Sequence, residues 1–195
     1  MLLQSNLNIT NIKQRLIFNS LFVMAYEQFI NGWEDILRSF YADVIENTNG
    51  TMTWRFSSKE KEKMFNNNIL RSYKNPQGKV IKGLSICNAL LLISIIDDDD
   101  FEVLKIVHDK RNAYVHEFPC MNQEVPDIDK KLFTDFLNIR SKALKNWIIE
   151  IEIPTNSQEE NSCFLDSDGC FVPPKDAFDI ADLYFKTLCE LALYK

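Results

Sequence analysis

Apolar positions recur at helical spacing through the first quarter of the chain. Between residues 10 and 48 they follow one another every three or four residues, which is the period of one face of an α-helix. The pattern predicts a helix over 10–48, kinked or divided at Gly32 and ended by the turn signal Asn49-Gly50. The apolar positions are Leu16, Phe18, Leu21, Phe22, Ala25, Phe29, Trp33, Ile36, Leu37, Phe40, Tyr41, Val44 and Ile45.

Five further segments have the pattern of helices. Ser57 or Ser58 offers an N-cap to the first of them, with two glutamates in its first turn. The aspartates at 97–100 place negative charge at the positive end of another, and Pro119 ends that helix. The predicted ranges are 58–73, 80–96, 99–117, 127–150 and 175–194.

Residues 154–174 form the one segment without helical character. Two short apolar triplets, CFL and CFV, flank DSDG at 166–169, which predicts a short hairpin. DSDG is also similar to the start of a calcium loop, but the glutamate ligand at the required spacing is missing, so we interpret it as a turn. The whole pattern predicts an all-α fold: a bundle of five to six helices in a single domain over 1–195, with a loop or hairpin excursion before the last helix.

Composition supports a folded domain and narrows the function classes. A chain of 195 residues with 46% hydrophobic residues fills a core, which argues against disorder. The net charge of −6 argues against general nucleic-acid binding, because phosphate contacts need concentrated Lys and Arg. An enzyme that contacts a few nucleotides through a local basic pocket remains compatible with that charge.

One basic cluster stands out in this acidic chain. Its members lie between residues 59 and 79, and we interpret them as a solvated helix face, with an RNA-guiding surface as the alternative. The members are Lys59, Lys61, Lys63, Arg71, Lys74 and Lys79.

The cysteines and the apolar runs predict a cytoplasmic protein without a metal centre. The five cysteines are irregularly spaced and contain no CxxC pair, as expected in a reducing compartment. A zinc site is not expected, since the two histidines lie far from any cysteine cluster. The longest apolar run, ALLLISII at 89–96, is far shorter than a membrane span, and the first residues lack the pattern of a signal peptide.

Both histidines of the chain lie in the predicted helix 99–117, beside an arginine. On a helical wheel Arg111 falls inside the apolar arc, and a buried arginine normally has a partner or a task. His108, Asn112 and His116 line up along one side at i, i+4 and i+8. Arg111 and His116, however, diverge by about 140° on an ideal helix. They meet only if the helix end unwinds before Pro119 or if a second subunit contributes its own copy.

An arginine and a histidine are the groups needed to cleave RNA through its own 2′-hydroxyl. Arginine grips phosphate with its planar fork, and histidine moves protons near neutral pH. One group deprotonates the 2′-hydroxyl, another protonates the leaving 5′-oxygen, and the cation stabilises charge on phosphorus. The expected products are a 2′,3′-cyclic phosphate and a 5′-hydroxyl end, and no cofactor is required.

The stretch RNAYVH at 111–116 resembles the Arg-(four to six residues)-His signature of the HEPN superfamily, in which a polar residue, often Asn, follows the arginine. This resemblance implies a small helical bundle with its motif near the end of a late helix. It implies a metal-independent ribonuclease of toxin–antitoxin, anti-phage or CRISPR systems, commonly a homodimer with a composite cleft. Arg111 would contact phosphate, His116 would be the catalytic acid or base, and Asn112 would orient the histidine or the RNA backbone.

The chain departs from the family pattern in three respects. It is acidic, it carries the extra segment 154–174, and Glu117 follows His116 where the family often has glycine. The expected partners are an RNA substrate, a second copy and an antitoxin or defence-system protein.

Other interpretations of the same residues stay open. Arg111 and His116 also suit a helix-end cap with an ion pair, and His108 suits a half-buried structural role. A catalytically inactive HEPN-like regulator or interaction protein is the alternative function. A helical domain unrelated to that superfamily is the third possibility.

Overall fold

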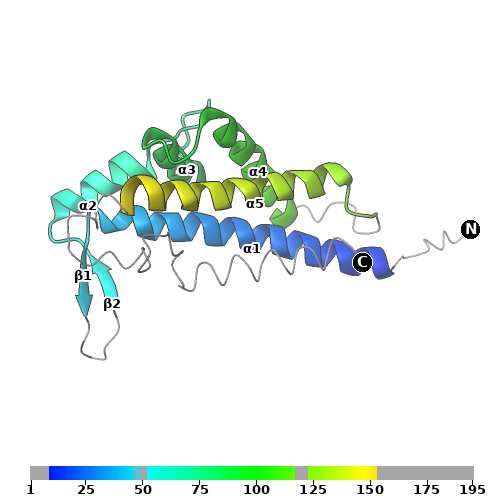
Figure 1. Cartoon of the computed structure of the whole chain (residues 1–195), viewed down its shortest axis with the longest axis horizontal. Coiled ribbons are helices and arrows are strands. Elements are labelled where there is room, and N and C mark those ends of the chain that lie inside the picture. The colour runs from blue at the N-terminus through cyan, green and yellow to red at the C-terminus, as the bar shows by residue number, and fades with distance from the viewer. Residues whose placement is uncertain (1–8, 47, 49–51, 117–122, 153–195) are drawn as a thin grey trace, which may run out of the picture. The chain divides into compact units, whose positions relative to one another are not determined.

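The computed structural model describes residues 9–46, 48, 52–116 and 123–152, and this part of the chain is an all-α bundle with one small hairpin (Figure 1). Two π-helical turns, η1 (Asn66–Leu70) and η2 (Ile148–Glu152), continue the second and fifth helices. The predicted all-α class is therefore confirmed. The helices are α1 (Ile9–Ser39), α2 (Lys59–Phe65), α3 (Lys82–Leu92), α4 (Asp98–His116) and α5 (Asp127–Trp147), and the strands are β1 (Asp43–Glu46) and β2 (Met52–Arg55).

The prediction of one helix over 10–48 is wrong in its last part. α1 is continuous through Gly32 but ends at Ser39, and β1 then pairs with β2 as an antiparallel hairpin in which Asp43 faces Arg55. Val44 and Ile45 fit helical spacing, yet both are β-branched residues that favour strands. Apolar spacing alone does not separate a helix from a strand over so few residues.

The other described helices match their predicted ranges with shorter ends. α3 covers the middle of the apolar segment 80–96 and ends before Ser94, whose φ of 62° lies in the left-handed region. α4 and α5 agree with 99–117 and 127–150 to within a turn. The predicted excursion at 154–174 and the predicted helix 175–194 lie outside the described residues.

The described chain divides into two compact units, and the divisions fall within α1 and α4. The first unit holds 9–25, 110–116 and 123–152, and the second holds 26–46, 48 and 52–109. The single domain over 1–195 stays a prediction.

Aromatic rings fill the core of the first unit. Phe22 lies edge-on to Tyr114 at 5.2 Å between ring centroids, and 5.3 Å from Phe133. Phe18 adds edge contacts to the same two rings at 6.1 and 5.5 Å. Edge-to-face packing of this kind adds to the stabilisation from burial and ties the ends of α1, α4 and α5 together.

The second unit has an aliphatic core centred on α3. Ile86 and Leu90 of that helix are fully buried, as are Leu104 and Val107 of α4. Cys87 is a free, fully buried thiol in this core, where it packs as a small apolar residue, and burial raises its pKa to about 12. The other four cysteines lie outside the described residues.

Candidate functional site

The motif residues lie in the last two turns of an intact helix. Asp97 and Asp100 start α4 reciprocally: the Asp97 side chain accepts from the Asp100 amide at 2.8 Å, and the Asp100 side chain accepts from the Asp97 amide at 3.2 Å. These bonds satisfy two backbone donors at the helix start, so Asp97 and Asp100 cap α4 as well as placing negative charge at its positive end. α4 then remains α-helical through His116.

Arg111 and Asn112 are joined by a side-chain hydrogen bond. Arg111 Nη1 donates to Asn112 Oδ1 at 2.9 Å, and both side chains are half-buried. An amide oxygen orients a guanidinium and leaves its positive charge intact, whereas a carboxylate would neutralise that charge. Asn112 was expected to orient the histidine or the RNA backbone; the contact seen is with Arg111.

His116 is the exposed last residue of α4. Because the helix is intact up to this residue, Arg111 and His116 leave it in directions about 140° apart. Unwinding of the helix end before Pro119 was one of the two ways in which they could meet; α4 does not unwind up to His116, and residues 117–122 lie outside the described part of the chain. Within α4 of one chain, the structure therefore does not bring Arg111 and His116 together.

A buried charge network, which we call the Asp129 network, lies next to the motif within the first unit. Asp129 is 3% exposed in the first turn of α5. Its Oδ2 accepts from the Tyr114 hydroxyl at 2.8 Å, and its Oδ1 lies 2.7 Å from Lys110 Nζ. Nη1 of Arg15, on α1, lies 3.9 Å from Oδ2 of Asp129. Burial, followed by the hydrogen bond to Asp129, raises the pKa of Tyr114.

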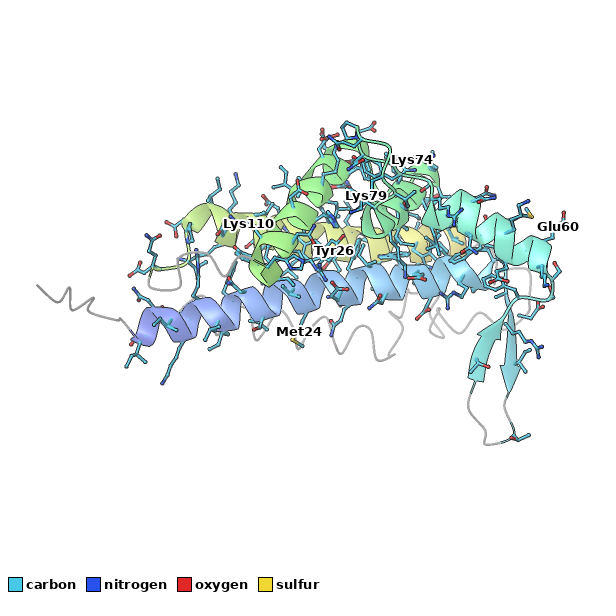
Figure 2. The ribbon with its side chains drawn as sticks, turned by 180° about the vertical axis from the view of Figure 1, so that it is seen from behind. Met24, Tyr26, Glu60, Lys74, Lys79 and Lys110 are labelled. Carbon is cyan, nitrogen blue, oxygen red and sulfur yellow. The ribbon has the colours of Figure 1, made fainter. Side chains whose placement is uncertain are left out.

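The Asp129 network sets the rotation of the motif helix. Lys110 (labelled in Figure 2) and Tyr114 are one turn apart on α4 and bracket Arg111 and Asn112 in sequence. Because both side chains reach Asp129, the rotation of this turn about the axis of α4 is fixed. The network was not predicted from the sequence. The sequence signal for a buried acid was its position on the apolar face of α5, because the buried Phe133 and Phe136 follow Asp129 at i+4 and i+7.

His108 belongs to the second unit and has a structural environment. Its Nδ1 lies 2.7 Å from the hydroxyl of the buried Tyr26, and its ring is half-buried. Gly83 of α3 lies against the same hydroxyl, at a distance that leaves no room for a side chain. This agrees with the structural interpretation of His108.

A hollow of about 360 Å³ lies in the first unit, lined by α1 and Tyr114. Arg111, Asn112 and His116 do not line it. The amide of Asn19 borders it and forms no hydrogen bond with any residue that the structure describes. Its other lining residues are Leu16, Ser20, Val23 and Met24.

Comparisons with known proteins give no relative: no family model matches the chain, and neither a curated protein nor a solved structure does. Among the described residues, no three His, Cys, Asp or Glu side chains are grouped so that they could hold a metal ion. No helix within the described ranges has the length and apolar character needed to cross a membrane.

Proposed function

We propose that this chain is a metal-independent endoribonuclease of the HEPN type that acts in the cytoplasm, in toxin–antitoxin or anti-phage defence. The observation that carries the proposal is the end of α4. There Arg111 is oriented by Asn112 at 2.9 Å, and His116 is exposed in the last turn of an unbroken helix. An arginine that can contact phosphate and an exposed histidine that can transfer a proton thus lie in the last two turns of one helix.

The chemistry follows from these groups. The 2′-oxygen attacks the adjacent phosphorus after losing its proton, and the bond from phosphorus to the 5′-oxygen breaks as that oxygen gains a proton. His116 acts as the acid or the base, and such a group typically accelerates a reaction by about 10² to 10⁴. Arg111 binds the phosphate oxygens and stabilises the added charge, while Asn112 positions the guanidinium.

A complete site needs two copies of the chain. Arg111 and His116 of one copy point about 140° apart, so a phosphate held by one arginine is out of reach of the same helix's histidine. In a twofold dimer, Arg111 of one copy and His116 of the other line one cleft. A homodimer is therefore part of the proposal.

The test is cleavage of RNA by purified protein with and without EDTA. Wild-type cleavage persists in EDTA and leaves 2′,3′-cyclic phosphate and 5′-hydroxyl ends. Arg111→Ala and His116→Ala each reduce the rate at least about a hundredfold. Glu102→Ala is the matched control, because it removes another exposed side chain of α4 and leaves the rate unchanged.

The proposal fails if transfer RNA, messenger RNA and phage transcripts all stay intact and the His116 variant is as toxic to cells as the wild type. That result favours the catalytically inactive regulator, which shares the same helical architecture.

A further inference from the structure

A long part of the second unit contains no acid. Residues 63–96 hold neither Asp nor Glu, whereas the whole chain holds 28 such residues among 195. At that average, a stretch of this length would hold roughly five acids. The stretch carries Arg71, Lys74, Lys79 and Lys82 as well as Lys63. A chain with a net charge of −6 therefore concentrates positive charge in one place.

The loop before α3 is ordered by its own hydrogen bonds. Lys74 pairs with Val80 in an isolated antiparallel bridge. Asn75 Oδ1 accepts from the amides of Gln77 at 3.1 Å and Lys79 at 2.8 Å, and Gly78 provides the positive φ of 77° that the turn needs. Figure 2 shows Lys74 and Lys79 on this loop. Both lysines therefore extend from a fixed backbone.

Contacts with α3 hold the base of the same loop. The Ser72 hydroxyl donates to the Ser85 carbonyl at 3.0 Å, and the Tyr73 amide donates to the Ser85 hydroxyl at 3.2 Å. Ser85 is fully buried. The loop is therefore anchored to the core of the second unit, which lowers the entropy lost when a ligand binds to it.

Three cations of this loop, Arg71, Lys74 and Lys79, are exposed, and none forms an ion pair with a residue that the structure describes. We call them the loop cations. Lys82 differs, because it lies 2.6 Å from the buried Glu34. The predicted basic cluster thus has two unequal halves: in α2 the lysines at 59, 61 and 63 alternate with Glu60 and Glu62, and in the loop no acid intervenes.

Acids mark one edge of this surface. The ring of Tyr73 lies edge-on to Phe101 of α4 at 5.7 Å, so the loop is next to the start of that helix, where the aspartates at 97–100 lie. The side chains of Asp97 and Asp100 accept hydrogen bonds from the helix start. Asp98 and Asp99 are exposed and repel phosphate, so the first turn of α4 disfavours a polyanion.

We infer that the loop cations bind the phosphate backbone of single-stranded RNA. Three exposed cations on a fixed loop, none of them paired with an acid of the described ranges, suit a polyanion. Exposed amides at Asn67, Asn68 and Gln77 add hydrogen-bonding groups for phosphates and base edges. A bilayer is a poorer fit, because no large exposed apolar side chain of the described chain lies between Met64 and Leu92. The inference rests on the proposed function only in its choice of RNA as the polyanion.

The experiment measures binding without cleavage. A fluorescein-labelled 20-nucleotide RNA is titrated in EDTA with protein that carries His116→Ala, so that the RNA stays intact. The further change Arg71→Gln, Lys74→Gln and Lys79→Gln weakens binding about a hundredfold at 0.1 M salt. It also lowers the slope of log K against log salt by about two, because each single-strand phosphate contact contributes about 0.7.

The matched control is Lys59→Gln, Lys61→Gln and Lys63→Gln in the same background, which removes three charges from α2. Its affinity for the RNA stays within about threefold, and circular dichroism confirms that both variants are folded. Equal loss in the two variants, or no loss in the loop variant, overturns the inference. Loss of binding to vesicles of 30% phosphatidylserine, with RNA binding unchanged, also overturns it in favour of a membrane surface.

The two proposals fail separately. Selective loss of RNA binding in the loop variant, together with no cleavage by the wild type, supports the loop surface and removes the nuclease. Cleavage by the wild type with unchanged binding in the loop variant does the reverse.

Discussion

Tyr114 connects the core of the first unit to its buried charge. Its hydroxyl donates to the buried Asp129 at 2.8 Å, and its ring packs against Phe22. Tyr114→Phe keeps the ring but leaves one carboxylate lone pair without its donor, so we expect the free energy of unfolding to fall by about 1.5–3 kcal/mol at pH 7. Urea denaturation measures this. Tyr41→Phe is the control, since Tyr41 packs through its ring against Phe65 and should change little.

The same hydroxyl makes stability depend on pH in the alkaline range. Burial and Asp129 raise the pKa of Tyr114 in the folded chain, whereas an unfolded tyrosine titrates near 10. The neutral hydroxyl therefore contributes its full stabilisation below pH 10, and that contribution is lost as the pH rises above 10. The advantage of wild type over Tyr114→Phe should shrink by about 1.4 kcal/mol between pH 9 and pH 11. A constant difference across that range would contradict the assigned burial.

At Gly83, the hydroxyl oxygen of Tyr26 decides whether alanine would stabilise or destabilise the chain. A Cβ there would collide with the Tyr26 hydroxyl and lie 3.5 Å from His108 Nδ1. Alanine is otherwise preferred to glycine inside a helix by about 1 kcal/mol. Gly83→Ala should therefore destabilise the wild type and stabilise a Tyr26→Phe background, in which the hydroxyl is absent. A double-mutant cycle by thermal denaturation checks this, and the same sign in both backgrounds would refute the assigned contact.

At the scale of elements, α2 depends on a single cap. Sequence left Ser57 and Ser58 as alternatives, and the structure identifies Ser58, whose hydroxyl oxygen accepts from the Lys61 amide at 3.2 Å. Ser58→Ala should cost about 1 kcal/mol and speed hydrogen exchange at the Lys61 amide. Ser57→Ala is the matched control and should leave that exchange unchanged. Equal effects of the two changes on stability and on exchange at the Lys61 amide would contradict Ser58 as the cap of α2.

The spacing of apolar residues predicted those elements in which it fits a helix and does not fit a strand. α4 and α5 are long enough for the helical period to be unambiguous. The hairpin was missed because four-residue strands hold too few positions to show a period of two. In the site, Arg111 and Asn112 are sequence neighbours, so their association was foreseeable. The Asp129 network joins residues from three helices. The sequence marks Asp129 as an acid in register with buried positions of α5, but it does not identify the partners of Asp129 on α1 and α4.

At the scale of the whole molecule, net charge alone hides how charge is distributed. A value of −6 argues against a protein that binds nucleic acid over its entire surface. It does not describe residues 63–96, where positive charge is uncompensated by acids in sequence. The proposed RNA binding at the loop cations and the proposed cleavage at the end of α4 each require only a local surface that favours phosphate, so the acidic net charge does not contradict either of them.

The composite site makes a prediction about mixtures of inactive chains. If Arg111 of one copy works with His116 of the other, a heterodimer of Arg111→Ala and His116→Ala contains one site with both groups intact and one with neither. Equal mixing should then restore about one quarter of the wild-type cleavage rate, because half of the dimers are mixed and each has one working site. Gel-based cleavage of labelled RNA, at concentrations where the dimer is formed, measures the recovery.

The control for this experiment mixes each variant with the double variant Arg111→Ala/His116→Ala, which should give no recovery. If the wild type cleaves RNA and the mixture of single variants does not, both groups act from the same copy. The end of α4 must then depart from helical geometry when RNA binds, since an intact helix through His116 keeps the two side chains about 140° apart.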